Sequence, residues 1–177
     1  MKGFVRVPRY VVVCAALVAA ACSVISPPDP GPCPKASIVA DAARMTQFRP
    51  GPGQDLIDIQ FDAEISRLDS SCAYNRAGDT ITAVTSVRII AARGPASNTT
   101  AGTMNFFVAV ADSGQRVLAR ERFSSDFTLQ RSQRRAGIVE EIEELIPLAP
   151  GQSGANFEIL IGFELTNDQL EYNRRRQ

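Results

Sequence analysis

The nine residues Ile57-Asp58-Ile59-Gln60-Phe61-Asp62-Ala63-Glu64-Ile65 alternate between apolar and polar side chains without a break. Successive side chains of an extended strand point to opposite faces, so this order places the apolar residues on one face and the polar residues on the other. A strand with one buried face and one wet face is typical of antiparallel sheets. The stretch therefore predicts an antiparallel β-strand that contributes one face to a core.

Several other segments carry strand signals. The segment Thr103–Ala111 is apolar on both faces, which predicts a central strand that is covered on both sides. Asp112–Gln115 has the composition of a hairpin turn, so the residues after it are expected to return beside that strand. A short first strand is expected within Ala36–Phe48. The remaining segments with strand-like composition are Thr80–Ala92, Val117–Phe123 and Phe157–Leu165.

The order of these segments predicts the fold class. Turns separate the strands and no long helical pattern lies between them, which is typical of all-β domains. We therefore expect a mainly β protein with a single antiparallel β-sandwich, of the immunoglobulin or fibronectin type III kind. Thr166–Gln169 has the spacing of a capping box, which predicts a short C-terminal helix. Arg174, Arg175 and Arg176 are expected to form a frayed, solvated end.

The segment 138–146 supports two interpretations. Its apolar residues recur at helical spacing with glutamates between them, whereas the segments on both sides are predicted strands. Pro147 ends the segment in either case. The context favours a strand slightly and the periodicity favours a helix.

The N-terminus has the three parts of a secretory signal peptide. Met1–Arg9 contains three basic residues and no acidic residue, and Val11–Ala21 is an uncharged run of small and apolar residues. This run is shorter than the roughly 20 apolar residues that a membrane-spanning helix requires. A buried core helix is the alternative, but the run lies at the terminus behind a basic cluster. We therefore expect residues 1–21 to be a signal peptide.

The end of this run, Ala19-Ala20-Ala21-Cys22, resembles the lipobox of bacterial lipoproteins. The resemblance covers only the first two dozen residues and implies that Cys22 becomes the lipidated first residue of the mature chain. It implies a lipid anchor in the cell envelope, and Ser23 favours the outer membrane facing the periplasm over the inner membrane. Ordinary cleavage after Ala21, giving a free periplasmic protein, is the alternative. The rest of the chain resembles no family that we recognise.

Counting cysteines gives a second prediction. Removal of the signal peptide removes Cys14 and leaves Cys22, Cys33 and Cys72 in an oxidising compartment. If Cys22 is acylated, Cys33 and Cys72 can form a disulfide, which would close a loop of about 40 residues and stabilise the fold by roughly 3 to 4 kcal/mol. A metal site at the two cysteines would need further cysteine or histidine ligands, and the chain has no histidine.

The mature chain divides into a spacer and a domain. Residues 22–35 hold the lipidated cysteine and a proline-rich segment, which we expect to be an extended spacer that could hold the domain some 30 Å from the bilayer. Residues 36–177 are expected to form the sandwich, and the folded region is expected to begin near Cys33 or Ala36. Removing residues 1–21 leaves three more acidic than basic residues, which argues against a nucleic-acid partner.

The search for catalytic chemistry identifies no candidate catalytic residue, metal site or cofactor. Without histidine there is no Ser-His or Cys-His pair, and no glycine-rich phosphate loop occurs. Three sets of charged residues each allow a functional interpretation, although a solvated surface is the favoured interpretation for all three. They are Asp58, Asp62 and Glu64 as paired carboxylates or calcium ligands; Glu140, Glu141, Glu143 and Glu144 as an acidic patch for cations or a basic partner; and Arg131, Arg134 and Arg135 as a contact for phosphate groups.

The first functional hypothesis is a membrane-anchored envelope lipoprotein without enzymatic activity. It would act in binding or assembly in the periplasm, contacting another envelope protein through an exposed strand edge or a loop end. The alternative is a periplasmic carrier of lipids or small molecules, which requires an apolar cavity enclosed by the strands. An enzyme is the third hypothesis.

Overall fold

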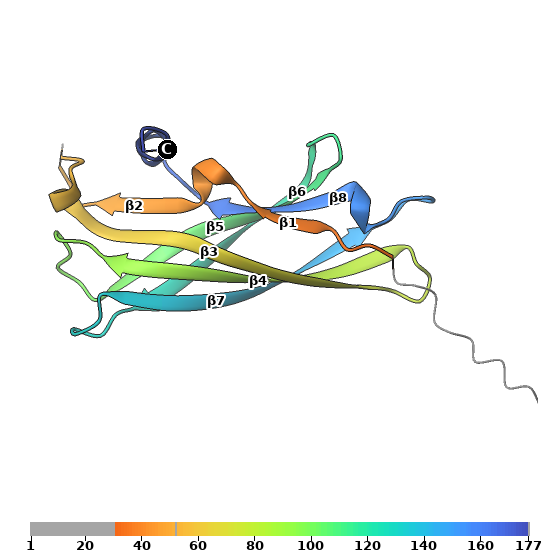
Figure 1. Cartoon of the computed structure of the whole chain (residues 1–177), viewed down its shortest axis with the longest axis horizontal. Coiled ribbons are helices and arrows are strands. Elements are labelled where there is room, and N and C mark those ends of the chain that lie inside the picture. The colour runs from red at the N-terminus through yellow and green to blue at the C-terminus, as the bar shows by residue number, and fades with distance from the viewer. Residues whose placement is uncertain (1–30, 52, 177) are drawn as a thin grey trace, which may run out of the picture.

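Two four-stranded β-sheets pack face to face in the computed structural model, which describes residues 31–51 and 53–176 (Figure 1). One sheet has the strand order β1-β8-β5-β6 and the other has the order β2-β3-β4-β7. The mainly β sandwich predicted from the sequence is thus confirmed. Its strands are β1 (Lys35–Ile38), β2 (Arg44–Phe48), β3 (Ile59–Tyr74), β4 (Thr80–Arg93), β5 (Ala101–Asp112), β6 (Val117–Thr128), β7 (Arg135–Pro147) and β8 (Phe157–Phe163).

Every strand pair in the described residues is antiparallel except one. β1 runs parallel to β8, with Ala36 beside Ile159 and Ile38 beside Ile161. The order of strands along the chain also differs from the ABED and CFG sheets of immunoglobulin constant domains, so the likeness to them lies in the two-layer architecture. β1 and β2 form the edges on one side of the sandwich, and β6 and β7 form the edges on the other side, where they contact each other.

The core lies between the sheets and is built from alternate residues of the strands. β5 lies between β8 and β6, as expected for the segment that is apolar on both faces. The alternating stretch 57–65 agrees with the prediction from position 59 onward, because its apolar residues there are buried. The largest fully buried side chains of the core are those of Phe106, Phe163, Ile81, Ile89, Met104, Leu129, Ile159 and Ile161.

The start of the alternating stretch differs from the prediction. Leu56–Asp58 forms a short 3-10 helix, η2, and β3 begins only at Ile59. The helical turn rotates the side chains out of the strand alternation, so Ile57 is 69% exposed whereas Asp58 is 3% exposed. The assignment of Ile57 to the buried face and of Asp58 to the wet face is therefore wrong.

The segment Ala36–Phe48 forms two strands instead of one. β1 and β2 belong to different sheets, and the 3-10 helix η1 (Ala40–Ala42) carries the chain from one layer to the other. A third 3-10 helix, η3 (Gly154–Asn156), precedes β8. The ambiguous segment 138–146 lies within β7 and is a strand, as its context suggested.

The C-terminal helix α1 (Asn167–Arg174) begins at the predicted capping box. The Thr166 hydroxyl accepts from the Gln169 backbone N–H at 3.3 Å, and the Gln169 side chain accepts from the Thr166 backbone N–H at 2.9 Å. The helix packs beside β2. Its last residues are not a frayed end: Arg174 is ion-paired with Asp41 at 2.8 Å, and Arg176 donates to the Tyr172 hydroxyl. No helix in the described residues has the length and apolar character needed to span a bilayer.

Candidate functional site

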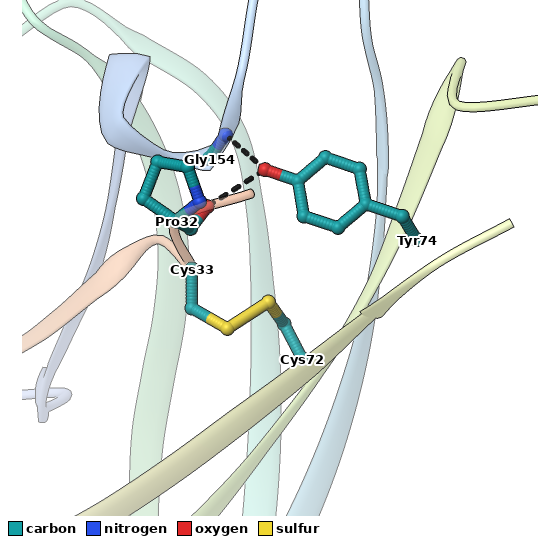
Figure 2. The surroundings of a disulfide bond; sticks show 5 residues. All are labelled: Pro32, Cys33, Cys72, Tyr74 and Gly154. Carbon is teal, nitrogen blue, oxygen red and sulfur yellow. Dashed lines mark hydrogen bonds between the residues drawn. A yellow bond between two sulfur atoms is a disulfide. The ribbon is translucent and has the colours of Figure 1, made fainter. Parts of the chain in front are cut away.

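The described chain enters the sandwich at a disulfide between Cys33 and Cys72, which confirms the predicted pairing (Figure 2). The two Cα atoms lie 5.6 Å apart, within the usual range for a disulfide. Cys33 precedes β1, an edge strand of the first sheet, and Cys72 lies near the end of β3 in the second sheet. The disulfide therefore links the two layers as well as the N-terminal segment to a central strand.

Tyr74, two residues after Cys72, fixes the segment before the disulfide. Its hydroxyl donates to the Pro32 carbonyl oxygen at 2.7 Å and accepts from the Gly154 backbone N–H at 2.8 Å (Figure 2). The segments that contain Pro32 and Gly154 pack closely together, because a Cβ atom at Gly154 would lie 2.2 Å from the Pro32 oxygen. Gly31 lies against the Tyr74 ring with a φ of +71°, in the left-handed region that favours glycine. We call Pro32, Cys33, Cys72, Tyr74 and Gly154 the N-terminal junction.

The N-terminal junction lies at one end of the elongated sandwich. The β3–β4 turn and the segment before β8 lie at the same end, whereas η2 and the β4–β5 and β6–β7 loops lie at the opposite end (Figure 1). We call the second end the distal pole. The exposed Leu56 and Ile57 side chains belong to η2 and so lie at the distal pole.

A polar groove with a volume of about 540 Å³ lies on the outer face of the second sheet, beside α1. Two of the predicted surface carboxylates line it, and both have partners. Asp62 accepts from the Thr46 hydroxyl at 2.7 Å, and Glu64 is ion-paired with Arg44 at 3.1 Å. The groove thus has mixed charges that are largely satisfied within the protein.

Asp58 does not belong to this carboxylate set. Its side chain is buried at the distal pole, where it is ion-paired with Arg49 and accepts from the Asp55 backbone N–H at 3.2 Å. The three carboxylates that the sequence placed on one face are therefore not brought together. Within the described residues, no group of three or more histidine, cysteine, aspartate or glutamate side chains could hold a metal ion.

The predicted acidic patch lies on β7, the free edge of the second sheet. We call Glu140, Glu141, Glu143 and Glu144 the acidic edge. Glu140 and Glu144 lie on the inner side of β7: Glu140 accepts from the buried Ser125 hydroxyl of β6, and Glu144 faces Glu121 of β6. Burial, and secondarily the Glu121 charge, raises the pKa of Glu144 above its ordinary value. Among the described residues, no salt bridge reaches any glutamate of the acidic edge.

The predicted arginine set is divided between a loop and a strand. Arg131 and Arg134 lie in the β6–β7 loop, and Arg135 is the first residue of β7. The loop is held by Arg93, whose side chain donates to the carbonyl oxygens of Arg131 and Gln130 at 3.3 and 3.2 Å. The three arginines therefore share the distal pole, and two of them contribute backbone atoms to its structure.

Comparisons with known proteins identify no family. No family model matches the chain, and no match is found among curated proteins. A solved structure, the variable domain of the Streptococcus agalactiae AgI/II polypeptide BspA, aligns over 70% of this chain and 73% of its own at 12% identity. The TM-score of this alignment is 0.17, too low for any argument about fold or function.

Of the predicted site residues, Cys33 and Cys72 are brought together, whereas Cys22 lies outside the described residues. The predicted signal peptide 1–21 and residues 22–30 of the predicted spacer lie outside them as well. Residues 32–34, assigned to the spacer, contact the sandwich through Tyr74 and Gly154. Tyr74 and Gly154 are junction residues that the sequence did not indicate, and only the position of Tyr74 two residues after a disulfide cysteine distinguishes it.

Proposed function

We propose that the protein is a lipid-anchored envelope lipoprotein without enzymatic activity, which acts in binding or assembly. Cys22 carries the lipid, and the sandwich faces the periplasm from the outer membrane, or from the inner membrane if Ser23 is not read as a sorting signal. The observation that carries the proposal is the N-terminal junction. Pro32 and Cys33 lie only ten and eleven residues after Cys22. The Tyr74 hydroxyl binds Pro32, and the disulfide joins Cys33 to the same end of the sandwich.

This arrangement gives the two ends of the sandwich different tasks. The N-terminal junction, where the chain from Cys22 reaches the sandwich, lies at one end, and the distal pole lies at the opposite end of the long axis. Leu56 and Ile57 are large apolar side chains that are exposed at the distal pole. Exposed apolar residues in a loop, together with free strand edges, are surfaces through which proteins of this architecture bind others.

A carrier of lipids or small molecules is the weaker alternative. Such a protein needs an enclosed apolar cavity, commonly of a few hundred Å³. The space between these two sheets is occupied by the tightly buried side chains of both inner faces. The groove beside α1 is lined mainly by polar and charged side chains and is open to solvent.

The anchoring half of the proposal is tested by exchanging single cysteines. Cys22→Ser removes the thioether-forming sulfur, and we expect the protein to move from the membrane fraction to the soluble periplasmic fraction. Cys14→Ser is the matched control and should leave the protein in the membrane fraction, with a diacylglycerol mass on its first residue. A wild-type protein with an unmodified terminus that washes freely from membranes would contradict the proposal.

The binding half is tested by position-specific crosslinking in the intact envelope. A photo-crosslinking residue replaces Ile57 at the distal pole, and in a second variant it replaces Arg76, which is exposed in the β3–β4 turn near the N-terminal junction. A third variant carries it at Glu143 on the free edge. We expect one discrete protein adduct from Ile57 or Glu143 and none from Arg76. Equal, unspecific labelling from all three positions would contradict a specific partner.

A further inference from the structure

The two sides of the sandwich differ in how their strand edges are protected. On one side β1 has four residues and β2 has five, and α1 covers β2 through the Gln169 and Asn173 side chains, which donate to backbone carbonyls of β2. On the other side β6 has 12 residues and β7 has 13. Within the described residues, β6 and β7 each pair with one neighbour only. Long free edges of this kind can accept an additional strand.

β7 is the more regular of these two edges. Its pairing with β4 runs from Arg135 opposite Ala92 to Pro147 opposite Thr80 without a register shift. The β5–β6 pairing, by contrast, contains an irregularity at Val110/Ala111. The two basic side chains of β6, Arg120 and Arg122, are also both bound to Glu164 at 2.5 and 3.1 Å. β7 therefore offers the longer uninterrupted template.

The hydrogen bonds at the two ends of the β4–β7 ladder show which backbone groups are free. The Arg93 N–H donates to the Arg134 carbonyl at 2.9 Å, and the Leu148 N–H donates to the Asp79 carbonyl at 2.8 Å. Backbone groups of alternate residues in an antiparallel strand point the same way, so even-numbered residues of β7 bond to β4. The odd-numbered residues direct their N–H and C=O groups away from β4. Those at the centre of the free edge are Val139, Glu141, Glu143 and Leu145.

The side chains around this row of free backbone groups define the partner. From Val139 to Leu145 the strand reads apolar, acidic, acidic, apolar, acidic, acidic, apolar, and Val139 and Leu145 are both exposed. Glu141 and Glu143 lie on the outer face and receive no ion pair within the described residues. On the inner face Glu144 adds to the charge of Glu121. An added strand would thus meet negative charge on both of its faces.

We propose that β7 binds an extended, basic segment of another protein as a fifth strand of the second sheet. Its basic side chains would lie opposite the four glutamates of the acidic edge, and its apolar side chains opposite Val139, Ile142 and Leu145. This inference rests on the proposed binding function and names the chemistry of the partner. A second copy of β7 is a poorer occupant, because antiparallel self-pairing centred on Ile142 puts Glu141 opposite Glu143 and Glu140 opposite Glu144, and like charges in direct opposition are unfavourable.

The probe is a labelled peptide containing Val-Arg-Arg-Val-Arg-Arg-Val, titrated by fluorescence anisotropy onto the purified full chain. Its control has glutamate in place of every arginine. We expect saturable binding of the basic peptide only. Two further peptides carry N-methyl groups on alternate residues, one on the odd and one on the even positions. Strand addition uses the N–H groups of only one set, so one methylated peptide should lose at least about tenfold in affinity and the other should bind nearly as well as the parent.

A pair of protein variants tests the same edge from the other side. Glu141→Pro removes an N–H that β4 does not use, which an edge strand tolerates, whereas Glu141→Ala removes the same charge and keeps the N–H. We expect the proline variant to bind the peptide at least about tenfold more weakly than the alanine variant. Circular dichroism checks that both variants fold. If the proline variant does not fold, the N-methylated peptides decide the question alone.

Three results with the peptides would each overturn the inference: no peptide binding, equal binding of the acidic and basic peptides, or equal binding of both methylated peptides. Equal effects of methylation would mean that charge alone attracts the probe. Self-association of the chain that Glu141→Pro abolishes would also overturn it, because a second copy would then occupy the edge. None of these results depends on Cys22, so the inference can fail while membrane anchoring stands, and the reverse also holds.

Discussion

The hydroxyl of Tyr74 donates a hydrogen bond to the carbonyl oxygen of Pro32, a residue 42 positions earlier in the chain, at 2.7 Å. The Tyr74 hydroxyl oxygen also accepts a hydrogen bond from the Gly154 N–H at 2.8 Å, so one side chain joins three segments that are distant in sequence. Tyr74→Phe removes both interactions, and we expect the free energy of unfolding to fall by about 1–2 kcal/mol. Urea denaturation measures the change. Tyr172→Phe is the control, because its hydroxyl accepts a hydrogen bond from Arg176, four residues later in the same C-terminal segment, and a smaller loss is expected.

The disulfide should stabilise the sandwich more than Tyr74 does. Cys33 and Cys72 are 39 positions apart, so the bond removes the closure entropy of a long loop from the unfolded chain. We expect the Cys33→Ala/Cys72→Ala variant to lose roughly 3–4 kcal/mol of unfolding free energy, measured by urea denaturation. The Cys22→Ala variant is the control and should unfold at the wild-type denaturant concentration. Equal midpoints for all three proteins would contradict the stabilising role of the disulfide.

A substitution at Thr85 is expected to stabilise the protein, in contrast to the two substitutions above. The Thr85 side chain is 1% exposed on the inner face of β4, and its hydroxyl has no hydrogen-bond partner among the described residues. Thr85→Val replaces an unsatisfied hydroxyl with a methyl group of similar shape, so we expect a gain of about 1 kcal/mol in unfolding free energy. The matched control is Thr46→Val, which removes the hydroxyl bound to Asp62 and should destabilise the protein. A Thr85→Val protein that unfolds more readily than wild type would contradict this account.

Two glycines should respond differently to alanine. A Cβ atom at Gly154 would lie 2.2 Å from the Pro32 oxygen, so Gly154→Ala must displace the chain at the N-terminal junction. We expect a loss of about 2 kcal/mol or more, measured by thermal unfolding. A Cβ atom at Gly137 on β7 meets none of the described residues within 4 Å, and Gly137→Ala should be neutral or slightly stabilising because it restricts the unfolded chain. Similar losses at both positions would show that the junction is not closely packed.

Glu144 predicts a pH dependence. Its pKa is raised from the ordinary value of 4.5, first by burial and then by the Glu121 charge. The folded state therefore favours the protonated carboxyl, and the stability that this provides is present below about pH 4.5 and is lost as the pH rises through the folded-state pKa. Glu144→Gln should raise the melting temperature at pH 7 by about 1–3 °C. The difference from wild type should shrink as the pH is lowered to 4, and a constant difference would contradict this origin.

The regular strands could be predicted because local pattern and burial agree there. The turn of η2 could not, since the alternation of Ile57 and Asp58 continues the pattern of β3 without a break, although Asp58 is held inward by Arg49 and the Asp55 N–H. The crossover between β1 and β2 contains neither glycine nor proline, so the sequence shows no punctuation where the chain changes sheets.

β7 was ambiguous for a physical reason. Glu140 and Glu144 take inward positions that a central strand would give to apolar residues, and Val139 and Leu145 take outward ones. Polar residues on the inner face and apolar residues on the outer face together give the apolar spacing of a helix. An edge strand allows this arrangement because its inner face is partly in contact with water. The disulfide could be predicted by counting cysteines. The Tyr74 contacts could not, because they join segments that are distant in sequence and no local sequence pattern indicates which segments meet.

The position of the Cys33–Cys72 bond has a mechanical consequence. β1 pairs with β8 through only four residues, and a tension applied at the N-terminus could otherwise unzip it from the sheet. The bond lies before β1 in the chain, so the pull is diverted across sulfur into β3, whose 16 residues are paired with β4 over most of their length. A force applied at the N-terminus would therefore load β3 through the disulfide, and the four-residue pairing of β1 with β8 would be largely spared.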